Sequence, residues 1–365
     1  MITNEERKKK IAVLTYHRHN NYGAVLQCYA LQRILENMQC SPSVIDYICK
    51  ADLYPWTLEA IKARGVLPCA ISIIGNFIRY PRKRKFSRFR KCMRYTVRCD
   101  KSSIKSIGDS YDFYIVGSDN VWNSAITGFD KNYFLDFVDK RKKRKTYAAS
   151  FGSTQIPECQ KPQYINLLEE IDGLCVREKS GAELINKLIG KEAKVVVDPT
   201  LLLSKEDWNL LSGDRLIEKP YIFAYQLVPS IGFIKFVKKQ AKELGCIPVF
   251  TPFPMGGILK AKSRPSDGPK EWISLLRYAD YVITDSFHGC VFSIIYGKPF
   301  AVYISQMGER IENLLDSLEI PNRCVNEHEP FKWLPIDYEK VNNILYKERE
   351  NSINILRREL ELGES

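Results

Sequence analysis

The chain has 365 residues, of which 45% are hydrophobic, 27% charged and 12% aromatic. This length is enough for two domains of about 150 residues each, and the aromatic content excludes a disordered protein. No stretch approaches the ~18 consecutive apolar residues of a membrane-spanning helix, and no apolar secretory segment follows the amino terminus, so we expect a cytoplasmic protein. The eleven cysteines contain no C-x-x-C pair, which predicts reduced thiols and no metal site.

The net charge of +12 is concentrated in two segments. Residues 79–101 carry eleven Lys or Arg against Asp100 alone, and residues 140–145 read KRKKRK, so the remaining chain is mildly acidic. An apolar run, 66–80, leads into the first basic segment, a composition typical of a helix at an anionic membrane surface. A solvated basic helix has the same composition, and both interpretations stay open. Nucleic acid is not an expected partner, because the chain contains no known binding module.

The first half of the chain alternates strand and helix patterns. A helical pattern at 24–38 repeats apolar residues every four positions and follows an apolar, β-branched run. This is a βαβ opening, the unit of parallel α/β sheets. Strands are predicted at 10–15, 43–47, 112–119, 145–152, 173–176 and 194–198, the last ending at a proline.

The second half repeats the alternation. Strands are predicted at 220–228, 247–252, 281–286 and 300–303, and helices at 231–244, 271–279 and 289–297. Two such sets predict an α/β protein with two Rossmann-like domains facing a cleft. We expect an amino-terminal domain over 1–204 with a basic insertion at about 66–101, a carboxyl-terminal domain over 205–336, and a helix over 337–365 that packs across both.

Polar and titratable residues follow five of the predicted strands. Ligands of open α/β sheets bind beyond the carboxyl ends of strands, so these residues predict a site shared by both domains. The chain lacks the P-loop, the dinucleotide fingerprint G-x-G-x-x-G and the nucleophile elbow G-x-S-x-G. The polar groups lie at 17–23, 117–120, 150–153, 177–180 and 285–289.

Two of these positions have a functional and a structural interpretation. His288, in D-S-F-H-G, falls in the first turn of a predicted helix, where an anion is favoured; alternatively Asp285 or Ser286 caps the helix and His288 only packs. Arg177 at a strand end predicts an anion clamp, and the alternative is an ion pair with Glu178 or Glu183.

Two further positions are also ambiguous. N-Y-G at 21–23 is first of all a turn with Gly23 at positive φ, although Asn21 is also a candidate substrate ligand. Asp198 before a proline either ends a strand or takes part in the chemistry.

Six motifs together resemble the polysaccharide pyruvyl transferases. They occur in the family's order within residues 10–305: N-Y-G-A-V-L-Q, I-V-G-S-D-N-V-W, A-A-S-F-G, V-R-E-K-S-G, V-D-P-T-L-L and A-D-Y-V-I-T-D-S-F-H-G-C-V-F-S-I-I-Y-G-K-P. The resemblance implies a fold like the GT-B glycosyltransferases. It also implies phosphoenolpyruvate as co-substrate, no cofactor, and a hexose of a surface-polysaccharide precursor as acceptor, with a cyclic pyruvate ketal as product.

The resemblance also implies roles for individual residues. His288 matches the family's functional histidine and Arg177 matches a basic residue near the donor, while Ser286 stands where some members have arginine. Lys298 or Arg310 could replace that arginine. The donor-binding set implied in this way is Ser286, Gly289, Lys298 and Arg310.

Ketal formation itself demands certain groups. A proton must reach C3 of the enolpyruvate, cationic or N–H groups must hold carboxylate and phosphate, and polar groups must orient two sugar hydroxyls. We therefore assign His288 to acid–base work or phosphate contact and Arg177 to the donor carboxylate. Asp119 and Asn21 are assigned to the acceptor hydroxyls, with Gly23, Ser118 and Asn120 beside them.

Two other functions remain open at this point. A glycosyltransferase of the same fold would use a nucleotide sugar instead of phosphoenolpyruvate. A non-catalytic scaffold would dock a glycan-assembly complex on the membrane through residues 79–101. A lipid-linked acceptor would make such membrane contact useful to an enzyme as well.

Overall fold

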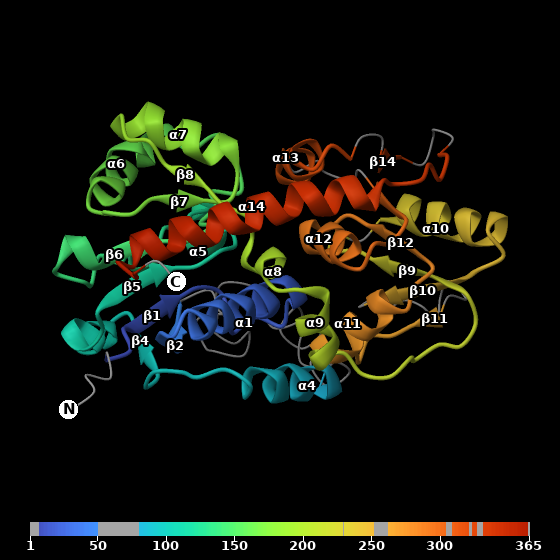
Figure 1. Ribbon diagram of the computed structural model, residues 1–365, viewed down its shortest axis with the longest axis horizontal. Coiled ribbons are helices and arrows are strands. Elements are labelled where there is room, and N and C mark those ends of the chain that lie inside the picture. The colour runs from blue at the N-terminus through green and yellow to red at the C-terminus, as the bar shows by residue number, and fades with distance from the viewer. Residues whose placement is uncertain are drawn as a thin grey trace, which may run out of the picture. The chain divides into compact units, whose positions relative to one another are not determined.

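The computed structural model describes residues 7–49, 80–228, 230–251, 262–303, 309–320, 323–326 and 331–363. The chain forms two compact units (Figure 1). Unit 1 comprises Met1–Tyr54, Lys91–Leu202 and Lys347–Ser365, and unit 2 comprises Pro55–Arg90 and Leu203–Tyr346. Each unit contains a parallel β-sheet with helices between its strands, as the alternating pattern of the sequence predicts.

The central sheet of unit 1 has four parallel strands in the order β2-β1-β5-β6. The first strand is fully buried after its first residue, which explains its unbroken apolar sequence, because a sheet covered on both faces has no polar side. Two short parallel pairs accompany it, β3 with β4 and β7 with β8. The strands are β1 (Lys10–Leu14), β2 (Ser41–Val44), β3 (Tyr47–Ile48), β4 (Cys99–Asp100), β5 (Phe113–Val116), β6 (Arg144–Thr146), β7 (Cys175–Val176) and β8 (Lys194–Val195).

The helices of unit 1 begin at recognisable caps. Asn21 caps α1, its side chain accepting a hydrogen bond from the Ala24 N–H, and Pro199 occupies the first position of α8, where a missing N–H does no harm. The helices are α1 (Tyr22–Asn37), α5 (Ser124–Thr127), α6 (Lys161–Glu169), α7 (Lys179–Ile189) and α8 (Pro199–Leu202), with 3-10 turns η2 (Ile104–Ser110), η3 (Lys131–Phe134), η4 (Arg141–Lys143) and η5 (Glu158–Gln160).

An aromatic cluster supports the loop that follows β5. The Trp122 ring stacks on Phe134 at 5.6 Å between centroids, and its Nε1 donates to the Tyr133 carbonyl at 2.9 Å. The Tyr164 hydroxyl donates to the Trp122 carbonyl at 2.6 Å. Because these rings are buried and hydrogen-bonded, they hold the polar residues 118–120 in a fixed place.

Unit 2 contains six parallel strands in the order β11-β10-β9-β12-β13-β14. Counted along the chain, this is the 3-2-1-4-5-6 order of the Rossmann fold, with its switch point between β9 and β12. The strands are β9 (Tyr221–Tyr225), β10 (Ile247–Thr251), β11 (Lys262–Ser263), β12 (Tyr281–Thr284), β13 (Phe300–Tyr303) and β14 (Cys324–Val325).

Helices pack on both faces of this sheet through their buried apolar side chains. Phe233 of α10 packs in a cluster with Ala224, whereas Trp272 of α11 contacts Tyr225 and Phe292, so successive residues of β9 point to opposite layers. The helices are α4 (Tyr80–Arg90), α9 (Lys205–Leu211), α10 (Ile231–Glu243), α11 (Pro269–Arg277), α12 (Phe287–Ile295) and α13 (Glu309–Ser317). The last helix, α14 (Tyr338–Glu359), contributes residues to both units.

The basic helix α4 departs from its predicted place. The sequence assigned it to the amino-terminal domain, but it belongs to unit 2, where Lys85 Nζ lies 2.7 Å from Glu271 of α11. Phe86 and Phe89 are buried, so these rings serve packing within the protein. The apolar run at 66–79 lies outside the described residues. None of the helices among those residues is long and apolar enough to cross a membrane.

Candidate functional site

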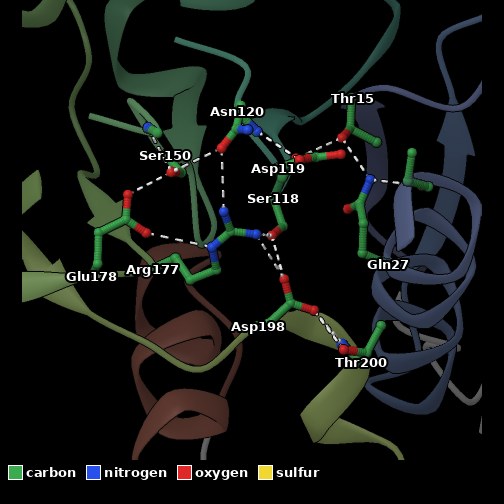
Figure 2. Close-up of polar contacts among 12 residues, drawn as sticks. Thr15, Gln27, Ser118, Asp119, Asn120, Ser150, Arg177, Glu178, Asp198 and Thr200 are labelled. Atoms are coloured by element: carbon green, nitrogen blue, oxygen red, sulfur yellow. Dashed lines mark hydrogen bonds and ion pairs between the residues drawn. The ribbon is translucent and has the colours of Figure 1, made fainter. Parts of the chain in front are cut away.

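Side chains from five strand ends meet at the carboxyl edge of unit 1 (Figure 2). They come from residues far apart in the sequence because parallel strands all end at the same edge of a sheet. The polar residues are Thr15 after β1, Ser118, Asp119 and Asn120 after β5, Ser150 after β6, Arg177 and Glu178 after β7, and Asp198 and Thr200 after β8.

Arg177 is the centre of this cluster and is only 8% exposed. Its Nη1 lies 3.3 Å from Asp198 Oδ2 and 3.4 Å from Ser118 Oγ, its Nε donates to Glu178 at 3.4 Å, and its Nη2 donates to Asn120 Oδ1 at 3.5 Å. Burial lowers the pKa of the guanidinium, but the carboxylates of Glu178, Asp198 and Asp119 outweigh it and the pKa is raised. The alternative interpretation, an ion pair with Glu178, is therefore the observed one, and Arg177 is engaged by unit 1 itself.

Asp198 is equally well satisfied. Its carboxylate accepts from Ser118 Oγ at 2.7 Å and from the N–H and hydroxyl of Thr200 at 3.0 and 2.6 Å. Ser118 is fully buried in this network, which corrects its expected place on the acceptor. The Ser150 hydroxyl donates to Glu178, so both carboxylates beside Arg177 have further partners.

The network continues to the first strand, where the sequence had indicated no role. Thr15 Oγ1 donates to the Ser118 carbonyl at 2.8 Å and accepts from Gln27 Nε2 at 2.9 Å. Gln27 Nε2 also lies 2.9 Å from the Ala24 carbonyl, while Oε1 of the same side chain has no partner among the described residues. A polar residue on the buried face of an apolar helix was the available signal for Gln27, which is fully buried.

Asp119 and Asn120 lie half-buried beside the network. Asp119 has φ of +81°, in the left-handed region, where a residue other than glycine carries strain of order 1–3 kcal/mol. Its carboxylate accepts from the Asn120 N–H at 2.8 Å. Gly152 has φ of +66°, and a Cβ there would lie 2.8 Å from Asn120 Oδ1, so a glycine leaves room for this amide. This loop is tightly built, and contact of Asp119 and Asn120 with the acceptor stays a prediction.

Asn21 and Gly23 are placed differently from the turn interpretation. Asn21 is exposed and caps α1, and Gly23 lies inside that helix, so positive φ is not what the position requires. The motif N-Y-G therefore begins a helix, and a substrate role for its two outer residues stays a prediction.

A second charged group follows β1 and β2. Asp46 Oδ1 lies 3.3 Å from His17 Nε2 and also pairs with Arg18, while Arg98 Nε donates to Oδ2 at 3.0 Å. Burial raises the pKa of Asp46, but these hydrogen bonds and charges outweigh it and hold the pKa below its usual value. This carboxylate is therefore ionised and structural.

His288 lies in the first turn of α12, at the carboxyl edge of the sheet of unit 2, and is 8% exposed. Ser286 caps the helix, its hydroxyl accepting from the Gly289 N–H at 3.4 Å, which is the alternative role foreseen for it. Asp285 accepts from the N–H groups of Leu227 and Val228 at 2.7 and 3.0 Å. Burial raises the pKa of Asp285 against the opposing effect of these bonds. The loop after β9 is thus tied to the end of β12.

Gly289 has a packing reason to be glycine. A Cβ at this position would lie 2.3 Å from Thr284 Oγ1, and the same oxygen accepts the Ser286 N–H at 3.1 Å. The close approach seats the first turn of α12 on β12. Donor contacts of Ser286 and Gly289 stay predictions beside this structural role.

The two basic candidates differ in position. Lys298 precedes β13 at the amino edge of the sheet, where its Nζ donates to the Ala279 carbonyl at 2.8 Å, and burial lowers its pKa. This placement contradicts the expectation that Lys298 accompanies His288. Arg310, in the first turn of α13, follows the carboxyl end of β13 across residues 304–308, which lie outside the described part of the chain.

The sequence of this chain matches the model of the family described as polysaccharide pyruvyl transferase over residues 21–306. The chain belongs to this family. No curated protein sequence matches it.

Solved structures resemble the fold. A UDP-N-acetylglucosamine 2-epimerase matches at 12% identity and a TM-score of 0.51, over 96% of this chain and 95% of that one. The UDP-GlcNAc 2-epimerase of Neisseria meningitidis, bound to UDP-GlcNAc, matches at 9% identity and 0.50, over 96% and 99%. At such identities the likeness concerns the fold, and it confirms the predicted α/β, GT-B-like class with two Rossmann-like units.

Proposed function

We propose that this pyruvyl transferase moves the enolpyruvyl group of phosphoenolpyruvate onto a hexose of a surface-polysaccharide precursor, forming a cyclic pyruvate ketal and releasing phosphate. Membership of the family supports transfer of a pyruvyl group. The observation that carries the donor site is His288, buried in the first turn of α12 at the Rossmann switch edge of unit 2. A helix amino terminus offers N–H groups and a positive dipole end to a phosphate.

The proposed reaction has two additions. A proton is added to C3 of the enolpyruvate and C2 becomes electrophilic, so one sugar hydroxyl adds to C2 and loses its proton. The bond from C2 to the phosphate oxygen then breaks, and the second hydroxyl adds to C2 and loses its proton, closing the ketal. His288 would supply or accept a proton or contact the phosphate. Asp119 and Asn120, half-buried and rigidly held, would orient the acceptor hydroxyls, and Arg177 acts as a positioning residue beneath them.

The test is donor binding by the full chain. We expect phosphoenolpyruvate to raise the temperature of unfolding, since a ligand at 100 times its Kd stabilises a protein by about 2.7 kcal/mol. The His288→Ala variant should lose this shift, measured against its own unfolding temperature without ligand. A shift with nucleotide sugars alone would replace the proposal with a glycosyltransferase, and a full shift in His288→Ala would remove His288 from the site.

The basic segment adds a proposal about location. Arg84, Arg88 and Lys91 are exposed along and just after α4, whose rings point into the protein, so their charge is available to an anionic membrane surface that carries a lipid-linked acceptor. We expect co-sedimentation with vesicles containing phosphatidylserine and none with neutral vesicles. Equal sedimentation with both would contradict the proposal.

A further inference from the structure

A buried amide occupies the switch point of unit 2. Gln226 follows β9 directly, and the register pairs the last residue of β9, Tyr225, with Thr284 of β12. Gln226 is therefore next to Asp285 at the edge where the Rossmann strand order reverses. Ligands of such sheets bind at this point.

The amide of Gln226 makes no hydrogen bond to the described residues. The residue is 8% exposed, and neither Oε1 nor Nε2 has a hydrogen-bond partner in the described part of the chain. The backbone just after it is held by the two hydrogen bonds to Asp285, so the residue is fixed in place. Buried polar groups are rarely left unpaired, because each one loses its hydrogen bonds to water without compensation. A ligand at the switch point would satisfy this amide.

A second glutamine in unit 2 shows what a structural amide looks like. Gln240 of α10 is 3% exposed, its Nε2 donates to Glu243 at 2.8 Å, and its Oε1 accepts from Trp333 Nε1 at 2.7 Å. Both ends of this side chain are paired although it is more buried than Gln226. Burial alone therefore does not explain why the Gln226 amide lacks hydrogen-bond partners among the described residues.

We propose that Gln226 is a phosphate-binding residue at the switch point of unit 2, which receives the phosphate of the donor beside the first turn of α12. This inference deepens the proposed function and rests on it for the identity of the donor. A primary amide both donates and accepts hydrogen bonds. A phosphate monoester has several acceptor oxygens, and its monoanion, the main form below its second pKa of about 6, also donates a hydrogen bond, whereas an ionised carboxylate only accepts. The amide therefore matches the phosphate of phosphoenolpyruvate better than its carboxylate.

The experiment compares the same substitution at the two glutamines in the full chain. Methionine has the length of glutamine and no strong hydrogen-bonding group, so Gln226→Met removes an unsatisfied amide and Gln240→Met removes a satisfied one. Without ligand, we expect Gln226→Met to raise the temperature of unfolding by about 2 °C or more and Gln240→Met to lower it. Titration with inorganic phosphate and with phosphoenolpyruvate should show at least ~10-fold weaker binding in Gln226→Met, about 1.4 kcal/mol, and wild-type affinity in Gln240→Met.

Pyruvate serves as the carboxylate probe, and its binding should be equal in all three proteins. The inference is overturned if Gln226→Met lowers the unfolding temperature as Gln240→Met does, if it binds phosphate as tightly as the wild type, or if the wild type binds no phosphate. The phosphate readout is independent of turnover. If phosphate binding depends on Gln226 but the protein transfers no pyruvyl group, the proposed function is wrong. The phosphate site would still be supported.

Discussion

Both units contain a parallel sheet with a switch point, but they differ in the side chains that surround that point. In each unit the first strand lies between two neighbours, β1 between β2 and β5 in unit 1 and β9 between β10 and β12 in unit 2, so each sheet has a switch point. In unit 1 the surroundings of this point are occupied by Arg177, two carboxylates and their hydroxyl partners. In unit 2 the same point holds Gln226, whose amide finds no partner among the described residues.

This difference separates an edge whose buried groups pair with one another from an edge that we propose binds the donor. The groups around Arg177 satisfy one another, so the edge of unit 1 is rigid before any ligand arrives; Gln27 Oε1 is the exception within it. The edge of unit 2 supplies a helix terminus, a histidine and the Gln226 amide, which has no partner among the described residues. Each sheet thus offers a switch point, and side-chain chemistry decides at which one the described groups already pair with one another.

The largest expected effect comes from removing Arg177 from the carboxyl edge of unit 1. Arg177→Leu leaves Asp198 and Glu178 buried without their cation, and removing one partner of a buried ion pair destabilises a protein by about 3–5 kcal/mol. Urea unfolding of the purified variant measures this loss. The matched control is Arg98→Leu, which removes a guanidinium that is 65% exposed beside Asp46 and should change stability by about 1 kcal/mol or less.

If Arg177→Leu lost as little stability as Arg98→Leu, the buried carboxylates around Arg177 would not need its positive charge. Arg177→Lys sharpens the result, because it keeps the charge and removes the planar fork that reaches Asp198 and Asn120 together. We expect the stability of Arg177→Lys to lie between that of the wild type and that of Arg177→Leu.

Periodicity in the sequence predicted the central strands of both sheets, the helices α1, α10, α11, α12 and α14, and the edge at which polar residues gather, but not the short strands β11 and β14 or the helices α9 and α13. The apolar, β-branched runs and the polar residues after them are local signals, so Asp119, Arg177 and His288 could all be placed at strand ends. What the local signal could not show is the partner of each side chain. Ser118 was expected on a ligand and lies in a hydrogen bond to Asp198, which is eighty residues away in the sequence.

Two other cases show the same limit. Lys298 follows His288 closely in sequence, but α12 intervenes and returns the chain to the opposite edge of the sheet. Gln226 lies in an apolar run and gives no pattern of its own. Its interest comes only from the absence of a partner among the described residues, which depends on the tertiary structure.

A smaller effect tests how the first turn of α12 is seated. Gly289→Ala places a Cβ 2.3 Å from Thr284 Oγ1, and overpacking of this kind typically destabilises by about 1–3 kcal/mol. Donor affinity should fall as well, because His288 precedes the displaced residue. Chemical denaturation and phosphoenolpyruvate titration measure the two effects. Gly213→Ala is the control, since nothing lies within 4 Å of its Cβ, and equal behaviour of the two variants would show that α12 has room to move.

The smallest expected effect concerns how the stability of each unit responds to acid. The pKa of Asp46 in unit 1 is lowered, so near and below pH 4 the unfolded chain binds more protons at this residue than the native one, and acid weakens unit 1. The pKa of Asp285 in unit 2 is raised, so above the usual carboxyl range the native state holds the proton more firmly, and a fall in pH favours the native state at this residue.

Asp46→Asn and Asp285→Asn should therefore change the fall of stability at acid pH in opposite directions. Asp46→Asn removes a carboxylate that acid penalises, so the loss of stability between pH 6 and about pH 3 becomes shallower. Asp285→Asn removes one whose protonation helps, so the same loss becomes steeper. Urea midpoints at several pH values measure both slopes against the wild type. Parallel slopes in the two variants would mean that the carboxylates share one environment, and the contrast between a self-satisfied edge in unit 1 and a ligand-dependent edge in unit 2 would lose its electrostatic support.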